Sequence, residues 1–356
     1  MNKEKIQQGL LRWFDENQRD LPWRHTYDPY HVWISEIMLQ QTQVATVLPY
    51  FDRWLKTLPT IQDVAKAEED TILKLWEGLG YYSRARNLHK AAKFIVEKHG
   101  GEFPEKYEEI RALPGVGPYT AGAISSIAFN RESPIVDGNI IRLIARLRDY
   151  RENTRTNVKP FWGWAEELIP LGDARNFNQA MMEFGALVCT PKSPKCGECP
   201  LAKECQAFRN DAVSQVPNRG PKQEKIPIQV ALAVISDPDN DGKIFIQKRK
   251  GKGLMGGLWE FPGGKLEKKE SPQKALIREI QEELNIEIKD IKSITKIKHA
   301  YTKFTVDLHC FTATRAHGQI KLTAATDHRW VSLEEINNFP FPAANVKLIK
   351  MLRGGK

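Results

Sequence analysis

Apolar residues in the first part of the chain recur at helical spacing. Segments 7–14 and 32–39 both carry apolar side chains three and four positions apart, which is the pattern of an amphipathic helix. Pairs that interrupt helices, such as Leu21-Pro22, Gly100-Gly101 and Pro114-Gly115, divide this region into short segments. The alternating pattern of a half-buried strand is scarcely visible. Residues 1 to about 208 are therefore predicted to form an all-α domain.

The pattern changes after the last cysteine of a cluster that ends at position 205. Residues 216–226 are rich in proline and charge, without apolar periodicity, as in an interdomain linker. Strand-like runs follow, with one predicted helix at 272–284, and the runs cover 226–235, 243–248, 292–298, 304–314 and 328–331. We expect a multidomain chain: an all-α domain at 1–215, a linker at 216–226 and an α+β domain at 227–356.

Composition and charge narrow the possible functions. The chain has 356 residues, of which 41% are hydrophobic and 27% charged, enough for two folded cores. No apolar stretch is long enough to span a bilayer, so no membrane partner is expected. The net charge of +9 fits a polyanionic partner. The polar helical start, without an apolar signal segment, favours a cytoplasmic, bacterial protein.

Four of the five cysteines lie within seventeen residues, in the spacing Cys189-x6-Cys196-x2-Cys199-x5-Cys205. Such a cluster points to a metal site in a reducing compartment. The spacing resembles the [4Fe–4S] loop of the endonuclease III family, here residues 189–205, and a four-thiolate zinc site is the alternative. Lys192 and Lys195 lie within this loop, where they either contact DNA phosphates or are simply solvated.

A second motif surrounds the glycines of Leu113-Pro114-Gly115-Val116-Gly117. A tight turn before a helix presents backbone N–H groups to an anion, so Gly115 and Gly117 are candidate phosphate contacts. With Val136-Asp137-Gly138-Asn139 about twenty residues after the hairpin, the segment resembles the helix-hairpin-helix glycosylase superfamily, whose catalytic aspartate matches Asp137. Strand-cleaving members carry a lysine at the position of Tyr119, and a tyrosine cannot form an imine. The resemblance therefore implies a monofunctional glycosylase that uses water as its nucleophile.

A third motif, residues 33–43, places Glu36 inside an apolar helical segment, where an unpaired carboxylate is costly. Pairing with Arg24 is the structural alternative to a catalytic role. With its flanking residues, the motif resembles the adenine DNA glycosylases of the MutY type. The resemblance implies that Glu36 is a general acid assisted by Tyr119 and Asn139. It implies an adenine pocket formed by Trp23, Arg24 and Gln179, and further DNA contacts from Gln41, Thr42, Leu79 and Tyr81. The implied partner is double-stranded DNA with an A:8-oxoguanine or A:G mispair, bound by a monomer associated with the nucleoid.

The second domain carries a box that resembles the Nudix motif, from Gly264 to Ile286, with Asn285 where the motif has glycine. Glu279, Glu282 and Glu283 share one helix face and could bind Mg²⁺. Three interpretations stay open. The domain reads the lesion and its box is a relic, or the protein also hydrolyses an oxidised nucleotide diphosphate, or the whole chain is a non-catalytic DNA-binding scaffold.

The segment 299–303 is a candidate lesion-reading loop. His299, Tyr301 and Thr302 offer an aromatic ring and a hydroxyl that can address 8-oxoguanine, although the family commonly has Phe-Ser-His where this chain has Tyr301-Thr302-Lys303. Lys303 suits a phosphate better than a base edge. The alternative is an ordinary connection between two strands.

Overall fold

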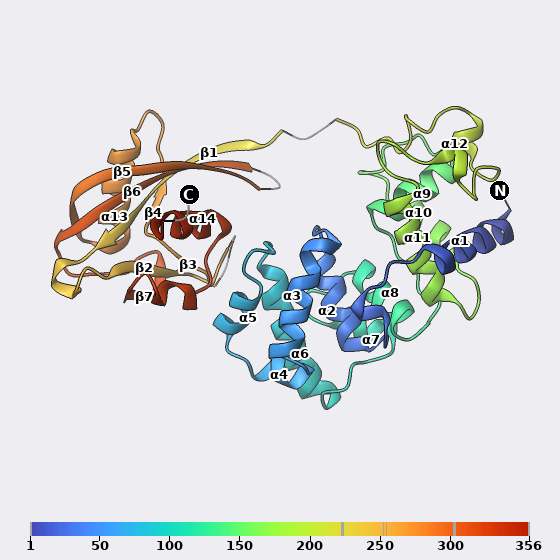
Figure 1. The fold of residues 1–356 in the computed structure, drawn as a ribbon, viewed down its shortest axis with the longest axis horizontal. Coiled ribbons are helices and arrows are strands. Elements are labelled where there is room, and N and C mark those ends of the chain that lie inside the picture. Colours follow the sequence, from blue (N-terminus) through green and yellow to red (C-terminus); the bar gives the residue numbers. More distant parts are fainter. Residues whose placement is uncertain (1, 222–223, 252, 254, 302–303, 355–356) are drawn as a thin grey trace. The chain divides into compact units, whose positions relative to one another are not determined.

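The computed structural model describes residues 2–221, 224–251, 253, 255–301 and 304–354 (Figure 1). The chain forms two compact units, of which the first comprises residues 1–66 and 90–222 and the second residues 67–89 and 223–356. The second unit is not continuous in sequence, since its residues 67–89 come from the first part of the chain but contact the C-terminal part. Among the described residues, no helix is long and apolar enough to cross a membrane.

The first unit is helical, as the apolar periodicity predicts (Figure 1). Short 3₁₀ turns at Pro22–Arg24 and Cys196–Glu198 complete it. Helix α6 (Ser83–His99) begins in the second unit and ends in the first. The remaining helices of the first unit are α1 (Lys3–Asn17), α2 (Pro29–Leu39), α3 (Val44–Thr57), α4 (Ile61–Lys66), α7 (Tyr107–Ala112), α8 (Pro118–Ile127), α9 (Gly138–Arg148), α10 (Lys159–Leu168), α11 (Ala174–Leu187) and α12 (Gln206–Arg209).

Local sequence explains where the helices that form the site begin. Helix α2 starts at Pro29, and the Asp28 side chain caps it by accepting a hydrogen bond from His31 N at 3.0 Å. Nearly every residue of α2 is buried, since it packs between α3 and α8. Helix α11 packs against α1, α8 and α9 and so forms the centre of this unit. Its Gly185 allows close approach to α9, because a Cβ there would lie 2.7 Å from Asn139 Cβ.

Helices α7 and α8 form the predicted hairpin and pack against each other. Gly115 lies in the connecting turn with φ of +78°, a left-handed conformation that favours glycine. Gly117 is the N-cap of α8, with Pro118 as the first helical residue. The turn therefore leaves the first backbone N–H groups of α8 without a side-chain cap.

The second unit contains a mixed sheet in the order β3-β2-β1-β6-β5, with β4 paired to β1 and β7 to β2. β1 and β6 run parallel over eleven residue pairs, whereas β5 and β6 form a long antiparallel ribbon. The strands are β1 (Ile226–Ser236), β2 (Ile244–Arg249), β3 (Trp259–Glu260), β4 (Gly263–Lys265), β5 (Glu287–Ala300), β6 (Phe304–His317) and β7 (Ala325–Val331). The helices are α5 (Glu69–Leu75), α13 (Pro272–Leu284) and α14 (Ala343–Leu352), with 3₁₀ turns at Pro238–Asn240 and Glu335–Asn338.

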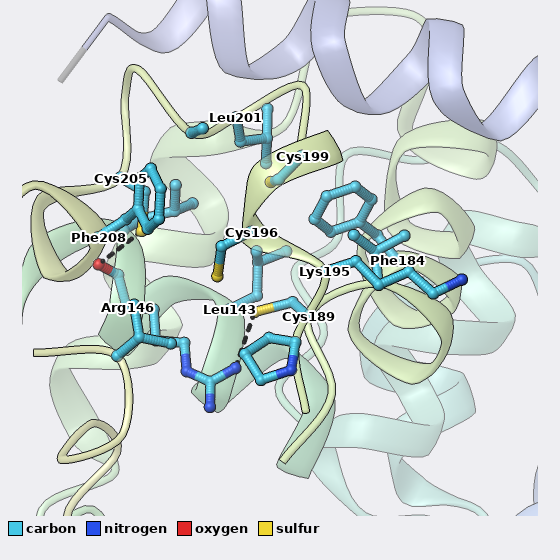
Figure 2. Close-up of a pocket in the computed structure, with 15 residues that line it drawn as sticks. Leu143, Arg146, Phe184, Cys189, Lys195, Cys196, Cys199, Leu201, Cys205 and Phe208 are labelled. Atoms are coloured by element: carbon cyan, nitrogen blue, oxygen red, sulfur yellow. Dashed lines mark hydrogen bonds between the residues drawn. The ribbon is translucent and has the colours of Figure 1, made fainter. Parts of the chain in front are cut away.

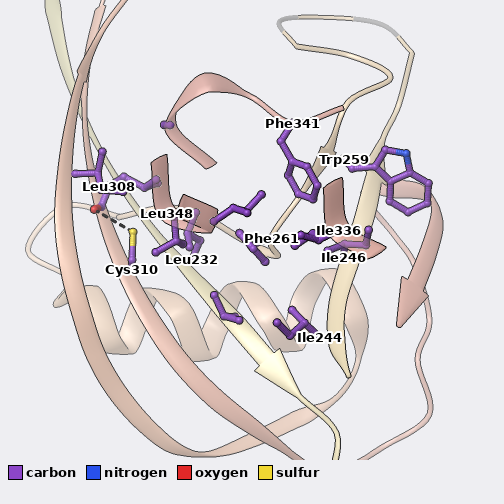
Figure 3. Close-up of a cluster of buried hydrophobic side chains, with 14 of the residues drawn as sticks. Leu232, Ile244, Ile246, Trp259, Phe261, Leu308, Cys310, Ile336, Phe341 and Leu348 are labelled. Atoms are coloured by element: carbon purple, nitrogen blue, oxygen red, sulfur yellow. Dashed lines mark hydrogen bonds between the residues drawn. The ribbon is translucent and has the colours of Figure 1, made fainter. Parts of the chain in front are cut away.

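Both faces of this sheet are covered, which explains the continuous apolar run in β1. Ala231, Ala233 and Ile235 of β1 belong to the core beneath α13. Leu232 and Val234 point to the opposite face, into the cluster shown in Figure 3, together with residues of α14. Cys310 lies in that cluster with no exposed surface, which confirms that it is a buried apolar residue rather than a ligand.

The strand-like runs predicted from the sequence all fall on strands of this sheet, and the predicted helix 272–284 matches α13. Strands β3 and β4, of two and three residues, and helix α14 were missed. The two strands are too short to show alternation, and tertiary pairing with β2 and β1 defines them.

Helix α13 ends at Asn285, the position where the Nudix motif has glycine. Its φ of 55° and ψ of 37° lie in the left-handed region, which asparagine tolerates better than other residues with a Cβ. The exchange of glycine for asparagine therefore preserves the end of the helix.

We expect Asn285→Ala to lower the free energy of unfolding by about 1 kcal/mol. The left-handed conformation is unfavourable for alanine, and its side chain cannot form a local hydrogen bond that would compensate. Asn285→Gly is the matched control and should be nearly neutral. Thermal denaturation followed by circular dichroism measures both variants. Equal melting temperatures for Asn285→Ala and wild type would contradict the argument.

Candidate active site

A pocket of about 420 Å³ lies within the first unit. This volume falls in the range of small-molecule sites, roughly 300–1,000 Å³. All four predicted catalytic residues and all three predicted adenine-pocket residues line it, and the full set is Glu36, Tyr119, Asp137 and Asn139 with Trp23, Arg24 and Gln179. Residues that are up to 156 positions apart in the sequence are thus brought into one cavity.

Glu36 is the buried carboxylate of this pocket. It lies on α2 with 5% of its surface exposed, and its Oε2 accepts a hydrogen bond from Tyr119 Oη at 3.0 Å. Burial, together with the negative charge of Asp137, raises the pKa of Glu36 to about 7, against the opposing hydrogen bond from Tyr119. A substantial fraction of Glu36 is therefore protonated near neutral pH. The alternative of an Arg24–Glu36 ion pair is not observed, since Arg24 directs its hydrogen bonds elsewhere.

Tyr119, at the start of α8, lies between two pocket residues. Its hydroxyl is 3.0 Å from Glu36 Oε2 and 3.2 Å from Met182 Sδ. Burial and the two neighbouring carboxylates raise the pKa of Tyr119 well above its ordinary value. Tyr119 is therefore a neutral hydrogen-bond donor in this pocket and has no tendency to ionise.

Asp137 is the N-cap of α9. Its Oδ1 accepts hydrogen bonds from the backbone N–H groups of Asn139 at 2.9 Å and Ile140 at 2.7 Å, and its Oδ2 accepts from Asn139 Nδ2 at 3.0 Å. Burial raises the pKa of Asp137, and these hydrogen bonds oppose the shift. The helix N-terminus also favours the ionised form. The carboxylate is thus held in one orientation at the wall of the pocket.

The buried side chain of Arg142 connects this helix start to the cysteine loop. Its Nη2 donates to Asn139 Oδ1 at 2.8 Å, and its Nε donates to the Cys189 carbonyl at 2.6 Å. A second buried arginine of α9, Arg146, donates to Cys189 Sγ at 3.3 Å and to the Thr190 carbonyl at 2.8 Å. Both arginines therefore hold the first cysteine of the cluster against α9.

The sequence analysis missed Glu183, which lines the pocket together with the predicted Gln179. Glu183 on α11 is 2% exposed and is ion-paired with Arg24 and Arg19 at 2.8 Å each. Burial alone would raise its pKa, but the hydrogen bonds from the two arginines lower the pKa of Glu183 to about 2. Gln179, one turn before it, accepts from Arg24 Nε at 2.9 Å. Glu183 lies four positions after Gln179 on the same helix, and this spacing could have predicted that both side chains face the pocket.

Cys189, Cys196, Cys199 and Cys205 line a second, apolar pocket of the first unit (Figure 2). Burial raises the pKa of Cys199 to about 12 and also raises the pKa of the Cys196 and Cys205 thiols. Four thiolates in such surroundings need a bound cation or cluster to be stable. Among the described residues, no three histidine, cysteine or acidic side chains are grouped tightly enough for a single metal ion. The donor set itself, four sulfurs around one apolar cavity, fits an iron–sulfur cluster.

The predicted DNA-contacting residues of the first unit lie at its surface or at the pocket. Thr42 lines the pocket, and the neighbouring Gln41 is exposed with a left-handed φ of 57°. Lys192 and Lys195 are both exposed in the cysteine loop. Gly115 is exposed in the hairpin turn and Gly117 is half-buried.

The remaining predicted residues belong to the second unit. Tyr81 is 44% exposed, whereas Leu79 is only 6% exposed. His299 and Tyr301 lie at the end of β5 with ring centroids 4.6 Å apart, and Tyr301 N donates to the Phe304 carbonyl at 2.8 Å. Thr302, together with Lys303, lies outside the described residues.

The three glutamates of the Nudix-like box lie on α13 as predicted, but their carboxylates contact protein side chains, Arg278 and Gln247. Arg278 contacts Glu279 and Glu282 at 3.1 and 3.2 Å, in addition to Glu270 at 2.9 Å. Glu283 accepts from Gln247 Nε2 at 3.0 Å, and burial raises the pKa of Glu283 to about 6. An arginine thus neutralises two of the carboxylates expected to bind Mg²⁺.

Comparisons with known proteins agree with these observations. Residues 34–162 match the HhH-GPD superfamily of base excision DNA repair proteins, 189–205 the iron–sulfur binding domain of endonuclease III, and 231–351 the NUDIX domain. Among relatives, the adenine DNA glycosylase of Mus musculus is 34% identical, with 96% of this chain and 77% of the relative covered. That of Buchnera aphidicola subsp. Baizongia pistaciae is 39% identical, with 84% and 83% covered.

The chain belongs to the adenine DNA glycosylase family. This confirms the resemblance, the multidomain fold class and the enzyme class predicted from the sequence, and it does not favour the dual-enzyme or scaffold alternatives. The glycosylase carries an iron–sulfur site rather than the alternative zinc site, and DNA is its partner. Among solved structures, a thermostable thymine-DNA glycosylase is 33% identical, with a TM-score of 0.55, and covers 58% of this chain and 97% of its own.

The buried Glu36 predicts a pH-dependent stability difference in this glycosylase. Because its pKa is raised above that of the unfolded chain, the folded state loses stability as the pH rises from about 4.5 to 7. Glu36→Gln removes this loss. The free energy of unfolding of the variant, relative to that of the wild type, should therefore increase by about 2 kcal/mol between pH 5.5 and 8.5. Melting temperatures at the two pH values measure the difference.

The exposed Glu16 of α1 provides the control, since Glu16→Gln should change the melting temperature equally at both pH values. A difference between wild type and Glu36→Gln that does not grow with pH would show that Glu36 has an ordinary pKa in the folded protein.

Proposed function

We propose that this glycosylase hydrolyses the N-glycosidic bond of adenine mispaired with 8-oxoguanine or guanine, as a monofunctional enzyme. One observation carries the proposal: a pocket of suitable volume contains a protonatable carboxyl group, Glu36, and a second carboxyl group, Asp137, that caps a helix N-terminus. These are the two groups that glycoside cleavage requires. The names of the relatives supply adenine as the base.

In the proposed reaction, protonated Glu36 donates its proton to N7 of the extruded adenine. The C–N bond then breaks with its electron pair leaving on the base, and the sugar becomes an oxocarbenium-like cation. Asp137 stabilises this cation as a counter-charge, and water adds to the sugar and gives its proton to the Glu36 carboxylate. Tyr119 and Asn139 hold the two carboxyl groups by the hydrogen bonds at 3.0 Å, so neither acts as a nucleophile.

The far wall of the pocket fits the edge of adenine. The exocyclic amine is a donor, and the charged Glu183 carboxylate and the Gln179 amide oxygen are acceptors on the same helix. The Arg24 guanidinium contacts both acceptors, at 2.8 and 2.9 Å, and therefore fixes their positions. Trp23, which is 4% exposed, supplies an apolar surface.

We further propose how the DNA duplex is held. Gly115, Gly117, Lys192 and Lys195 contact phosphates through backbone N–H groups and ammonium groups. Gln41, Thr42, Leu79 and Tyr81 contact the bases around the extruded nucleotide. The four cysteines hold a [4Fe–4S] cluster, which would supply a rigid anchor for the loop 189–205.

For the C-terminal domain, 227–356, we propose lesion reading through His299, Tyr301 and Thr302. Mg²⁺ at Glu279, Glu282 and Glu283 would be weak at most, because Arg278 already pairs with two of these carboxylates. We expect a monomer that acts in the bacterial cytoplasm on the nucleoid, with 1–215 as the catalytic domain and 216–226 as its linker.

We expect Glu36→Gln and Asp137→Asn each to reduce single-turnover adenine excision by about 10²- to 10⁴-fold, because general acid and electrostatic catalysis are lost. In the wild type, excision should fall about tenfold per pH unit above pH 7, since only protonated Glu36 is active. Duplex binding, measured by gel shift, should be nearly unchanged in both variants. Near-normal excision by Glu36→Gln would remove this residue from the mechanism.

The monofunctional assignment makes a separate prediction. Borohydride treatment of the enzyme during turnover should trap no covalent adduct with the DNA, because Tyr119 offers no amine for an imine. Denaturing electrophoresis of labelled duplex checks this, with a lysine-bearing strand-cleaving glycosylase as the positive control. Efficient trapping would mean that another lysine attacks the sugar.

A further inference from the structure

Within the second unit, the turn Phe339–Phe341 is hydrogen-bonded to the segment 74–82. Phe341 N donates to Glu77 Oε1 at 2.8 Å, and the Tyr82 hydroxyl donates to the Phe341 carbonyl at 3.1 Å. Lys74 Nζ donates hydrogen bonds to Glu77 Oε2 at 2.7 Å and to the Phe339 carbonyl at 3.1 Å. The turn is anchored in the core of the Nudix-like fold, where Phe341 is 1% exposed. We call these contacts of Lys74, Glu77 and Tyr82 the clasp.

The clasp surrounds a loop with an unusual backbone. Gly78, Gly80 and Tyr81 all have positive φ, of 103°, 71° and 48°. For Tyr81 this left-handed conformation is unfavourable and must be imposed by its surroundings. Tyr82 Oη also accepts from Gly78 N at 3.4 Å, so one hydroxyl bridges the start of the loop and the Phe339–Phe341 turn.

The other side of the loop is held by its own segment. Arg84 donates to the carbonyls of Leu79 at 3.0 Å and Gly80 at 3.2 Å, and Trp76 Nε1 donates to the Gly80 carbonyl at 3.1 Å. The Arg84 guanidinium also lies 5.6 Å from the centre of the Tyr81 ring. The loop therefore presents one partly exposed aromatic ring, Tyr81, in a defined orientation, as stacking on a base requires.

We propose that Glu77 and Tyr82 are positioning residues through which the Phe339–Phe341 turn fixes the orientation of Tyr81, and thereby set the preference for the base opposite adenine. This inference rests on the proposed function, in which Tyr81 contacts that base. Neither residue touches the DNA in this scheme; each acts by holding the loop against the lesion-reading fold.

Two substitutions test the clasp. Tyr82→Phe removes one hydroxyl and keeps the buried ring, and Glu77→Ala removes the acceptor of Phe341 N. Single-turnover excision is measured on duplexes that contain adenine opposite 8-oxoguanine or opposite guanine. Both variants should lower the ratio of the two rates by about two- to tenfold, the effect of a lost hydrogen bond. Glu77→Gln should restore most of the ratio, because its amide oxygen still accepts from Phe341 N.

Tyr30→Phe is the matched control. Tyr30 is, like Tyr82, 6% exposed, and its hydroxyl also donates to a backbone carbonyl, that of Leu58 at 2.6 Å, but in the first unit. It should leave the ratio unchanged even if it lowers the melting temperature. Hydrogen exchange supplies a readout independent of activity: peptides covering 78–82 and 339–341 should exchange faster in Glu77→Ala than in the wild type.

The outcomes separate this inference from the proposed function. If the wild type prefers 8-oxoguanine and both Tyr82→Phe and Glu77→Ala keep the same ratio, the positioning role of the clasp is refuted and the proposed function stands. An equal fall of the ratio in Tyr30→Phe would show a general effect of stability and would also overturn it. A wild-type ratio near one would refute the proposed lesion preference, and the clasp with it.

Discussion

The burial of one carboxyl group, Glu36, is the interaction on which the chemistry of this protein depends. Removing a carboxylate from water disfavours its charge, and here this raises the pKa to about 7, so that an acid is available at neutral pH. The surrounding helix α2 is buried along most of its length to create these conditions. A hydrogen bond of 3.0 Å from Tyr119 keeps the group oriented.

The other acids of the pocket have hydrogen-bond or ion-pair partners that oppose the effect of burial. Asp137 receives three hydrogen bonds at the start of α9, and Glu183 is paired with two arginines, so their charges are stabilised in place. Burial still raises the pKa of Asp137, whereas the two arginines lower the pKa of Glu183 to about 2, so the partners decide the direction of each shift. Arg142 and Arg146 join the same helix to Cys189, so the stability of the cysteine loop and the position of Asn139 are linked.

The second unit shows how a local loop can depend on a distant part of the chain. The segment 67–89 precedes most of the helical region in sequence, yet its contacts place it with residues 223–356. The strained backbone of Tyr81 is compatible with stable folding only because Arg84, Trp76 and the Phe339–Phe341 turn satisfy the groups around it.

Sequence alone determined the helices, most strands and the motif residues, because periodicity, turn residues and cysteine spacing are local properties. It correctly located the glycine hairpin and the helix at 272–284, each of which follows from a short stretch of residues. It also assigned Glu36, Asp137 and Tyr119 through motif resemblance, before any contact among them was known.

Tertiary structure alone decided which groups meet and what charge they carry. Glu183 lies 159 and 164 positions after Arg24 and Arg19 in sequence, and only the packing of α11 brings it to them. Strands β3 and β4 exist because their neighbours pair with them, and the contacts of Glu77 with Phe341 join positions 264 residues apart. Burial and partnership depend on the whole fold, so a pKa, a pocket or a clasp cannot be read from local sequence.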